Sequence, residues 1–244
     1  MPSALSDNVD GHRSKYEILK ASLPPEEVGK VFVGGSDPIW MGFCELEMIR
    51  RSKDLNGATV VDIGCGIGRL TQHMLHEPLT RYLGIDIIPE ILQDAIEIAK
   101  DDKRFSFEIG SDCKIPMEDG VADVVVAYSV ITHLLDEETF EYLQDARRVL
   151  KPGGVAIFSF LDFMYDRHVE NFFRHAAQHR HGHGDMLKYT TKEVLRLFGE
   201  KAGFSNVQFV DGVDALPTSG KTSPLMSEPP KKFQLGQSSC ILTA

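Results

Sequence analysis

The chain has 244 residues, of which 42% are hydrophobic and 25% charged, so it can bury a core without disulfides or metals. With 26 Lys and Arg against 36 Asp and Glu, its net charge of −10 argues against a broad nucleic-acid surface. It has no long apolar run, and its polar first residues do not resemble a targeting signal, so we expect no membrane span. The four cysteines stand far apart without paired spacing, which predicts reduced thiols and a cytoplasmic protein.

The first 54 residues are predicted to form a helical cap that precedes the main domain. A polar stretch contains one short helix over 13–22, which Pro24 and Pro25 end. A glycine-rich turn at 34–38 opens a second helix over 39–53. Its apolar residues recur at the spacing of one helical face: Ile39, Trp40, Phe43, Leu46 and Ile49.

From residue 55 onward, short apolar runs alternate with longer amphipathic stretches. The runs predict strands over 58–63, 81–85, 105–109, 122–128, 153–160, 207–210 and 237–243. The amphipathic stretches predict helices over 68–76, 89–100, 136–150 and 191–202. Strands that alternate with helices at this spacing predict an α/β fold with a parallel sheet and helices on both faces.

The alternation breaks after residue 161. We expect residues 162–185 to form a polar lid over a substrate pocket, and residues 211–232, rich in Pro, Ser, Gly and Lys, to form a loop or mobile arm. The lid holds five histidines whose spacings can ligate zinc, but nearby cysteines and a clear carboxylate pattern are missing, so we predict no metal site. These are His168, His175, His179, His181 and His183.

The most informative stretch is the glycine turn 62–68, with sequence Asp-Ile-Gly-Cys-Gly-Ile-Gly, between the first strand and the next helix. Glycines turn the chain tightly and let a ligand approach the backbone, and N–H groups at the helix start then face that ligand. A dinucleotide fingerprint requires glycine at its sixth position, where this chain has Arg69, so NAD and FAD fit poorly. No Gly-Lys-Ser/Thr follows, so the turn is not a P-loop.

The acid followed by alternating glycines resembles motif I of the class I S-adenosylmethionine-dependent methyltransferases. Further segments continue the resemblance over residues 55–160: Leu83-Gly84-Ile85-Asp86, Gly110-Ser111-Asp112-Cys113, Asp123-Val124-Val125-Val126 and Lys151-Pro152-Gly153-Gly154. The resemblance implies a Rossmann-like, doubly wound sheet of seven mostly parallel strands, with the last strand antiparallel. The methyltransferase core would then span 55–244, with S-adenosylmethionine as its cofactor.

Roles for individual residues follow from this resemblance. Asp86, at the end of the second strand, would accept both ribose hydroxyls, as the analogous acid does in dinucleotide folds. Asp112 would accept from the adenine amino group, and the backbone of Cys113 would donate to the ring. Asp62 would either contact the methionine part of the cofactor or only brace the loop. The expected cofactor-binding residues are Asp62, Gly64, Cys65, Gly66, Gly68, Asp86, Ile87, Asp112, Cys113, Tyr128 and Ser129.

The acceptor is expected at the carboxyl ends of the fourth and fifth strands, where ligands bind in open α/β sheets. His133 follows the fourth strand and is the best candidate for a general base, since histidine titrates near neutral pH. The alternative is a structural histidine at the start of the next helix. Asp162 follows the fifth strand and is either a second base or substrate anchor, or a loop acid without a role. Trp40, Phe172 and Phe173 would line the pocket or belong to the core.

The sequence therefore predicts methyl transfer to a small-molecule acceptor, most simply at oxygen or nitrogen. The alternative is a protein that binds S-adenosylmethionine without transferring methyl, or that uses it for another purpose. No Asn-Pro-Pro-Tyr type segment follows the fourth strand and no basic appendage is visible, so we expect neither nucleic acid nor membrane as a partner. The acceptor and the oligomeric state are left open.

Overall fold

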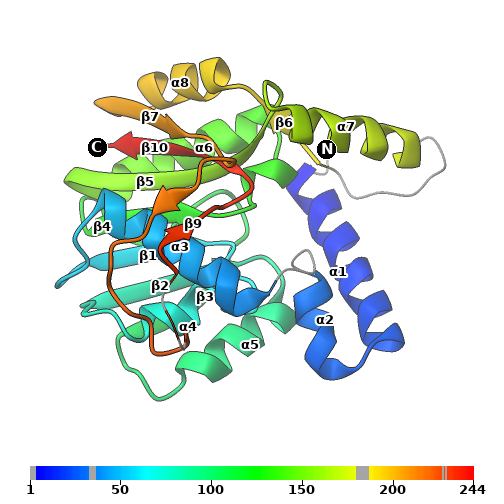
Figure 1. The fold of residues 1–244 in the computed structure, drawn as a ribbon, viewed down its shortest axis with the longest axis horizontal. Coiled ribbons are helices and arrows are strands. Elements are labelled where there is room, and N and C mark those ends of the chain that lie inside the picture. Colours follow the sequence, from blue (N-terminus) through cyan, green and yellow to red (C-terminus); the bar gives the residue numbers. More distant parts are fainter. Residues whose placement is uncertain (1–3, 33–36, 180–186, 227, 229) are drawn as a thin grey trace.

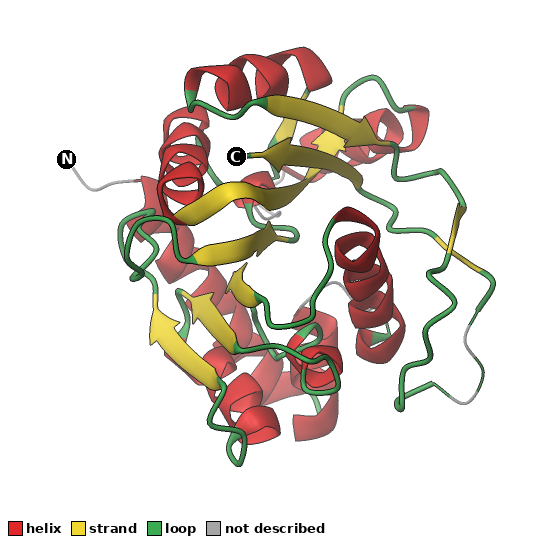
Figure 2. Cartoon of the chain, turned by 90° about the vertical axis from the view of Figure 1, so that its left-hand side faces the viewer, coloured by secondary structure: helices red, strands yellow, loops and turns green. Residues whose placement is uncertain are grey.

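The computed structural model describes residues 4–32, 37–179, 187–226, 228 and 230–244. One sheet forms the centre, and helices cover both of its faces (Figures 1 and 2). In order across the sheet, the strands are β3 (Phe105–Ile109), β2 (Arg81–Asp86), β1 (Thr59–Ile63), β4 (Ala122–Ala127), β5 (Leu150–Asp162), β10 (Ser238–Thr243) and β7 (Asn206–Val210). Strand β10 is antiparallel to β5 and β7, whereas the other pairs on this path are parallel, which confirms the predicted fold class.

The continuous apolar runs of β1 and β4 arise because both faces of the sheet are buried. Successive side chains point to opposite faces, so Val61 and Val125 enter one core cluster while Val60 and Val124 enter another. The first cluster lies beneath α6 (Asp136–Val149) and α8 (Lys192–Lys201), and the second beneath α3 (Pro38–Ser52) and α4 (Thr71–Met74). Helix α5 (Pro89–Ala99) packs against Cys65 and Phe107.

The N-terminal segment contains more helix than predicted. Helix α1 (Ala4–Ser22) begins well before residue 13, and a second helix, α2 (Pro25–Phe32), starts directly at the proline pair. Proline is favoured at the first helical position because its missing N–H would have no partner there, so Pro25 opens a helix after α1 has ended. Tyr16 and Val28 from these helices pack against Ile88 and Ile91 beside the sheet. The Asp37 side chain caps α3, as the turn predicted, while 34–36 lie outside the described residues.

Two elements of the main domain differ from the prediction by more than one residue at each end. Helix α4 spans only Thr71–Met74, because Gly68 has a φ of 81°, outside the helical region, and the chain turns before the helix starts. Strand β5 is longer at both ends: Leu150 already pairs with Ala122, and its last residues pair with β6 (Tyr189–Thr190).

The segment predicted as a lid contains α7 (Asp166–His179), and residues 180–186 lie outside the description, among them His181 and His183. Two short antiparallel strands, β8 (Leu216–Pro217) and β9 (Lys232–Phe233), pair with each other in and at the end of the predicted loop 211–232. A short 3-10 helix, η1 (Ile131–His133), follows β4.

Buried polar groups anchor the arm 211–232 to α3. Arg50 lies between Glu47 and Glu77, and the Ser219 hydroxyl donates to Glu47 over 2.9 Å. Burial lowers the pKa of His73, so its neutral ring can donate from Nε2 to the Ile39 carbonyl and accept at Nδ1 from Ser223. Because buried charges and hydroxyls require such partners, the arm is held in a defined place.

Substituting Gly42 with alanine should destabilise the protein. A Cβ on Gly42 would lie 1.9 Å from the Arg69 carbonyl oxygen, so α3 would have to move away from the glycine turn. We expect the free energy of unfolding to fall by about 3 kcal/mol or more, as in strongly overpacked cores. Gly11→Ala is the control, since nothing lies within 4 Å of its Cβ, and it should stabilise α1 by up to about 1 kcal/mol. Equal denaturation midpoints for both variants would contradict the packing at Gly42.

Candidate active site

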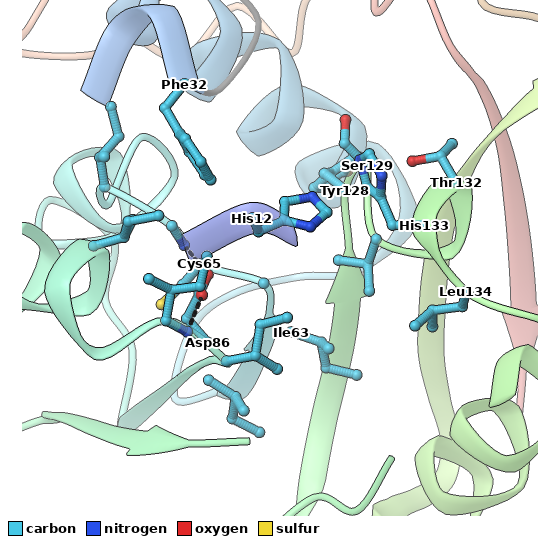
Figure 3. Close-up of a pocket in the computed structure, with 18 of the residues that line it drawn as sticks. His12, Phe32, Ile63, Cys65, Asp86, Tyr128, Ser129, Thr132, His133 and Leu134 are labelled. Atoms are coloured by element: carbon cyan, nitrogen blue, oxygen red, sulfur yellow. Dashed lines mark hydrogen bonds between the residues drawn. The ribbon is translucent and has the colours of Figure 1, made fainter. Parts of the chain in front are cut away.

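A cavity of about 370 Å³ lies at the carboxyl ends of β1, β2 and β4 (Figure 3). Its floor is formed by the glycine turn and by the loops that follow β2 and β4. Helices α1 and α2 close it from outside with His12, Lys15 and Phe32. The lining residues expected from the sequence are Gly64, Cys65, Gly66, Asp86, Ile87, Tyr128, Ser129 and His133.

The glycine turn depends on conformations that other residues adopt poorly. Gly64 and Gly66 have φ values of 70° and 55°, in the left-handed region. A Cβ on Gly64 would come within 2.5 Å of Val130 Cγ2. Gly68 does not line the cavity: its Cβ would meet Ala95 of α5 at 3.0 Å, so its role there is close packing of the turn on the helix.

Asp86 connects the turn to the next loop. One carboxylate oxygen accepts from the Gly66 N–H at 2.9 Å, and the other accepts from the Ile88 N–H at 3.0 Å (Figure 3). Burial raises the pKa of Asp86 above its ordinary value, and the backbone donors oppose this rise. Each carboxylate oxygen has a second lone pair, so the group can still accept two hydrogen bonds from a ligand in the cavity.

Asp62 lies beneath the turn and does not line the cavity. Its carboxyl is buried and accepts from the Tyr82 hydroxyl at 2.6 Å, and Tyr82 also contacts the Thr71 hydroxyl. Burial raises the pKa of Asp62 to about 7, despite the opposing hydrogen bond from Tyr82. This geometry favours the bracing role over direct contact with a ligand.

The two residues expected at the adenine end lie outside the cavity. The Asp112 side chain is exposed, and Cys113 is buried with a φ of 53°. Tyr142 of α6 lines the cavity, and burial raises the pKa of its hydroxyl, with the Cys113 thiol and Asp86 as further causes. The loop of Asp112 and Cys113 therefore lies near this end of the cavity without forming its wall.

The loop after β4 is held by a hydrogen-bonded network that sequence analysis missed. Ser129 has a φ of 61°, and its N–H donates to the Ser159 hydroxyl at 2.7 Å. The Gln237 amide donates to the Ser129 hydroxyl at 2.9 Å and accepts from Ser159 at 2.7 Å. Non-glycine residues in this conformation are strained and often occur at functional sites. Gln237 directly precedes β10, more than a hundred residues along the chain, and no local motif marks it.

Arg69 also lines the first cavity, although the sequence predicted no role for it there. It pairs with the buried Glu45 of α3 at 2.6 Å and borders both the first cavity and a second cavity of about 590 Å³. Trp40 and Arg167 line the second cavity, and Ser129 and Gln237 border both. Trp40 therefore lines a pocket, as one interpretation of the sequence expected.

His133 lines the first cavity from η1. Its ring meets that of His12 edge-on, with centroids 4.8 Å apart (Figure 3). The N-terminal backbone of α6 is satisfied by Glu138, whose carboxylate accepts from the Leu135 N–H at 2.8 Å. The structure thus places His133 at the cavity rather than in the cap of α6.

Asp162 lies away from the first cavity. Its side chain is buried and accepts from the Met164 N–H, while its own N–H donates to His168 Nδ1. His168 in turn binds the Gly236 carbonyl at 2.8 Å. Within the described residues, no group of three side chains could hold a metal ion.

The aromatic pair of α7 does not line either cavity. Phe172 packs with Phe163 and Tyr189, and Phe173 is 67% exposed.

Comparison with known proteins identifies the fold and a methyltransferase domain. A family model described as a methyltransferase domain matches residues 61–158. The chain is 33% identical to norajmaline N-methyltransferase of Rauvolfia serpentina over 98 residues, which cover 39% of this chain and 33% of that protein. It is 39% identical to the mitochondrial ubiquinone biosynthesis O-methyltransferase of Homo sapiens over 112 residues, which cover 42% of this chain and 28% of that protein. The matches thus span about a third of these relatives' lengths.

A solved structure shares the fold over the whole chain. It is phosphoethanolamine N-methyltransferase 1 of Haemonchus contortus, with a TM-score of 0.64 and 15% identity, covering 100% of this chain and 50% of that one. These matches show a methyltransferase domain over residues 61–158 and a fold that the whole chain shares with a solved methyltransferase. Among the described helices, none is long and apolar enough to cross a membrane.

Asp62 should make stability depend on pH. The folded protein holds a proton on Asp62 up to about pH 7, whereas the unfolded chain releases it near pH 4. The free energy of unfolding of the native protein should therefore fall, relative to that of Asp62→Asn, as pH rises from 4 to 8. The expected difference is on the order of 3 kcal/mol, and denaturant titrations of both proteins at several pH values measure it. Parallel pH profiles would show that Asp62 titrates normally.

Proposed function

We propose that this chain catalyses methyl transfer from S-adenosylmethionine to the oxygen or nitrogen of a small molecule. The observation that carries this proposal is the hydrogen bond from the Gly66 N–H of the glycine turn to the Asp86 carboxylate at the cavity floor. The cofactor, when bound, supplies a methyl group on a positively charged sulfur. The relatives named above act on small molecules at nitrogen and at oxygen, which supports both acceptor types for this chain.

The residues present fit this cofactor. The cavity volume lies in the range of small-ligand sites. The absence of side chains at Gly64 and Gly66 lets a ligand approach the backbone, and the spare lone pairs of Asp86 match two ribose hydroxyls. Arg69 stands where a dinucleotide turn requires glycine.

The chain's own residues would then bind and orient the two reactants and keep water out of the site. Asp86 would hold the ribose, and the network of Ser129, Ser159 and Gln237 would fix the loop beside the reacting group. His133 would accept the proton that an acceptor hydroxyl or ammonium releases. Aligning the two reactants in one enclosed site removes the entropy cost of their encounter.

Residues 1–54 would act as a cap in this reaction, since His12, Lys15 and Phe32 close the cavity. A dry site favours a reaction in which charge is neutralised, so closure of the cap would assist transfer. Residues 162–185 would form a lid on the other side, where Arg167 reaches the second cavity. We also propose that the protein acts in the cytoplasm, which its four buried free cysteines support.

A binding protein without transferase activity is the second candidate. It would keep Gly64, Gly66 and Asp86, because these serve the cofactor in either case. His133 at the cavity wall favours transfer, since a ligand-binding role alone gives no reason for a base there. Screening small hydroxylated and amino compounds for uptake of labelled methyl from S-adenosylmethionine separates the two. Binding of the cofactor without methyl uptake by any compound would support the binding protein.

Replacing Asp86 with alanine should weaken binding of S-adenosylhomocysteine. The loss of charge-assisted hydrogen bonds to the ribose corresponds to roughly 1.5–3 kcal/mol, or about 10- to 150-fold in Kd. Isothermal calorimetry measures this, with Glu200→Ala, an exposed acid on α8, as the control of unchanged affinity. The native protein should not bind NAD appreciably. Unchanged affinity in Asp86→Ala, or tight binding of NAD, would refute the assigned site.

Replacing His133 with alanine should lower methyl transfer by about 10²–10⁴-fold, the range typical of removing a general base. Affinity for S-adenosylhomocysteine should change little, because the cofactor contacts come mainly from the glycine turn and Asp86. Turnover with the acceptor found by the screen, and the melting temperature, are to be measured on one preparation. Normal turnover with a lowered melting temperature would assign His133 a structural role.

A further inference from the structure

One polar atom of the first cavity has no partner among the described residues. Thr132 is 2% exposed, and its hydroxyl oxygen makes no hydrogen bond within the part of the chain that the structure describes. A buried hydroxyl without a partner costs free energy, so each such group calls for an explanation. Thr132 lines the cavity, so a ligand bound there can supply the missing hydrogen bond.

The backbone holds Thr132 firmly in this position. Its carbonyl accepts from the Lys188 N–H at 2.7 Å, which joins η1 to the segment before β6. Next to it, the His133 N–H donates to the Val130 carbonyl at 2.9 Å. The Lys188 ammonium pairs with Asp136 at 2.6 Å. These contacts therefore hold Thr132 at the cavity wall.

Rings and apolar side chains surround this end of the cavity. His12 meets Phe32 edge-on with ring centroids 6.1 Å apart, and on its other side it meets His133. Leu134 and Leu187 complete the lining. Figure 3 places Thr132 and His133 on the side of His12 that is opposite to Asp86. A flat ring fits such walls, because aromatic groups favour edge-on and offset contacts.

The charges of the lining favour a neutral acceptor group over an ammonium. Among the described residues that line the cavity, Asp86 is the one carboxylate, and it lies at the opposite end. Lys15 and two histidines border the cavity instead. A cationic group beside them would lack a counter-charge, whereas a hydroxyl pairs well with the Thr132 hydroxyl, which both donates and accepts.

We propose that this end of the cavity, formed by His12, Thr132, His133, Leu134 and Leu187, is an acceptor subsite for a phenol, an aromatic ring that carries a hydroxyl group. The Thr132 hydroxyl hydrogen-bonds the phenolic oxygen and thereby selects it over an unsubstituted ring. The inference rests on the proposed methyl transfer, because only that reaction makes the subsite an acceptor site. Binding of a phenol can be measured without any reaction.

The test compares binding of phenol and toluene to the full chain, with and without S-adenosylhomocysteine, by ligand-observed NMR titration. Thr132→Val keeps the shape of the side chain and removes the hydroxyl, and Thr132→Ser keeps the hydroxyl. We expect phenol affinity to fall about tenfold in Thr132→Val and to stay within about threefold in Thr132→Ser. Toluene affinity should be the same in the native protein and Thr132→Val. The melting temperature of Thr132→Val should be unchanged or higher, because an unpaired buried hydroxyl is removed.

Two results would overturn the subsite: equal phenol affinity in the native protein and Thr132→Val, or no saturable phenol binding by the native protein. A lower melting temperature of Thr132→Val would also oppose it, since the hydroxyl would then have a structural partner. Failure of the native protein to bind S-adenosylhomocysteine is a separate result. It would refute the proposed cofactor, while the phenol titrations on the ligand-free protein would still decide the role of Thr132.

Discussion

The Asp86 carboxylate joins two loops that would otherwise be independent. By accepting from the N–H groups of Gly66 and Ile88, it sets the glycine turn at a fixed distance from the start of α5. The cost is a partly desolvated carboxylate, seen in its raised pKa. The same group thus organises the cavity floor and keeps lone pairs for a ligand, so structure and binding depend on one side chain.

The sheet beneath Asp86 is packed more extensively than helices α1 and α2, which cover the cavity. The sheet is buried on both faces by two large apolar clusters, and these hold the carboxyl ends of β1, β2 and β4 in place. Helices α1 and α2 are attached through a much smaller cluster around Tyr16 and Val28, besides an exposed contact between Arg13 and Glu90. Elements with few buried contacts open at lower free energy than the core. We therefore expect ligands to enter the cavity when α1 and α2 move away from the sheet.

Polar groups in this protein are buried in two different ways. Around α3, each buried charge has a partner: Arg50 has Glu47 and Glu77, and Glu45 has Arg69. Such pairs fix the arm 211–232 and the turn against α3. At the cavity, by contrast, the Thr132 hydroxyl is buried and has no hydrogen-bond partner among the described residues. Stability explains the first arrangement, whereas the second costs stability and is best explained by a ligand.

The layers of the fold and the floor of the cavity could be predicted from patterns in the sequence. Apolar runs such as Val124–Val126 are typical of strands covered on both faces, and Gly64, Gly66 and Asp86 adjoin strand ends that parallel pairing brings together. These features are local, or follow from the α/β alternation, so pattern analysis finds them.

Only the tertiary structure decided which distant side chains complete the site. His12, Thr132 and Gln237 meet at one cavity although they come from α1, from η1 and from the residue before β10, and nothing in their local sequence marks them. Conversely, Asp162 is the last residue of β5, yet its buried side chain accepts from the Met164 N–H and does not line the first cavity. Side-chain direction and long-range packing depend on the whole fold, because each contact must be balanced against the burial of every neighbour.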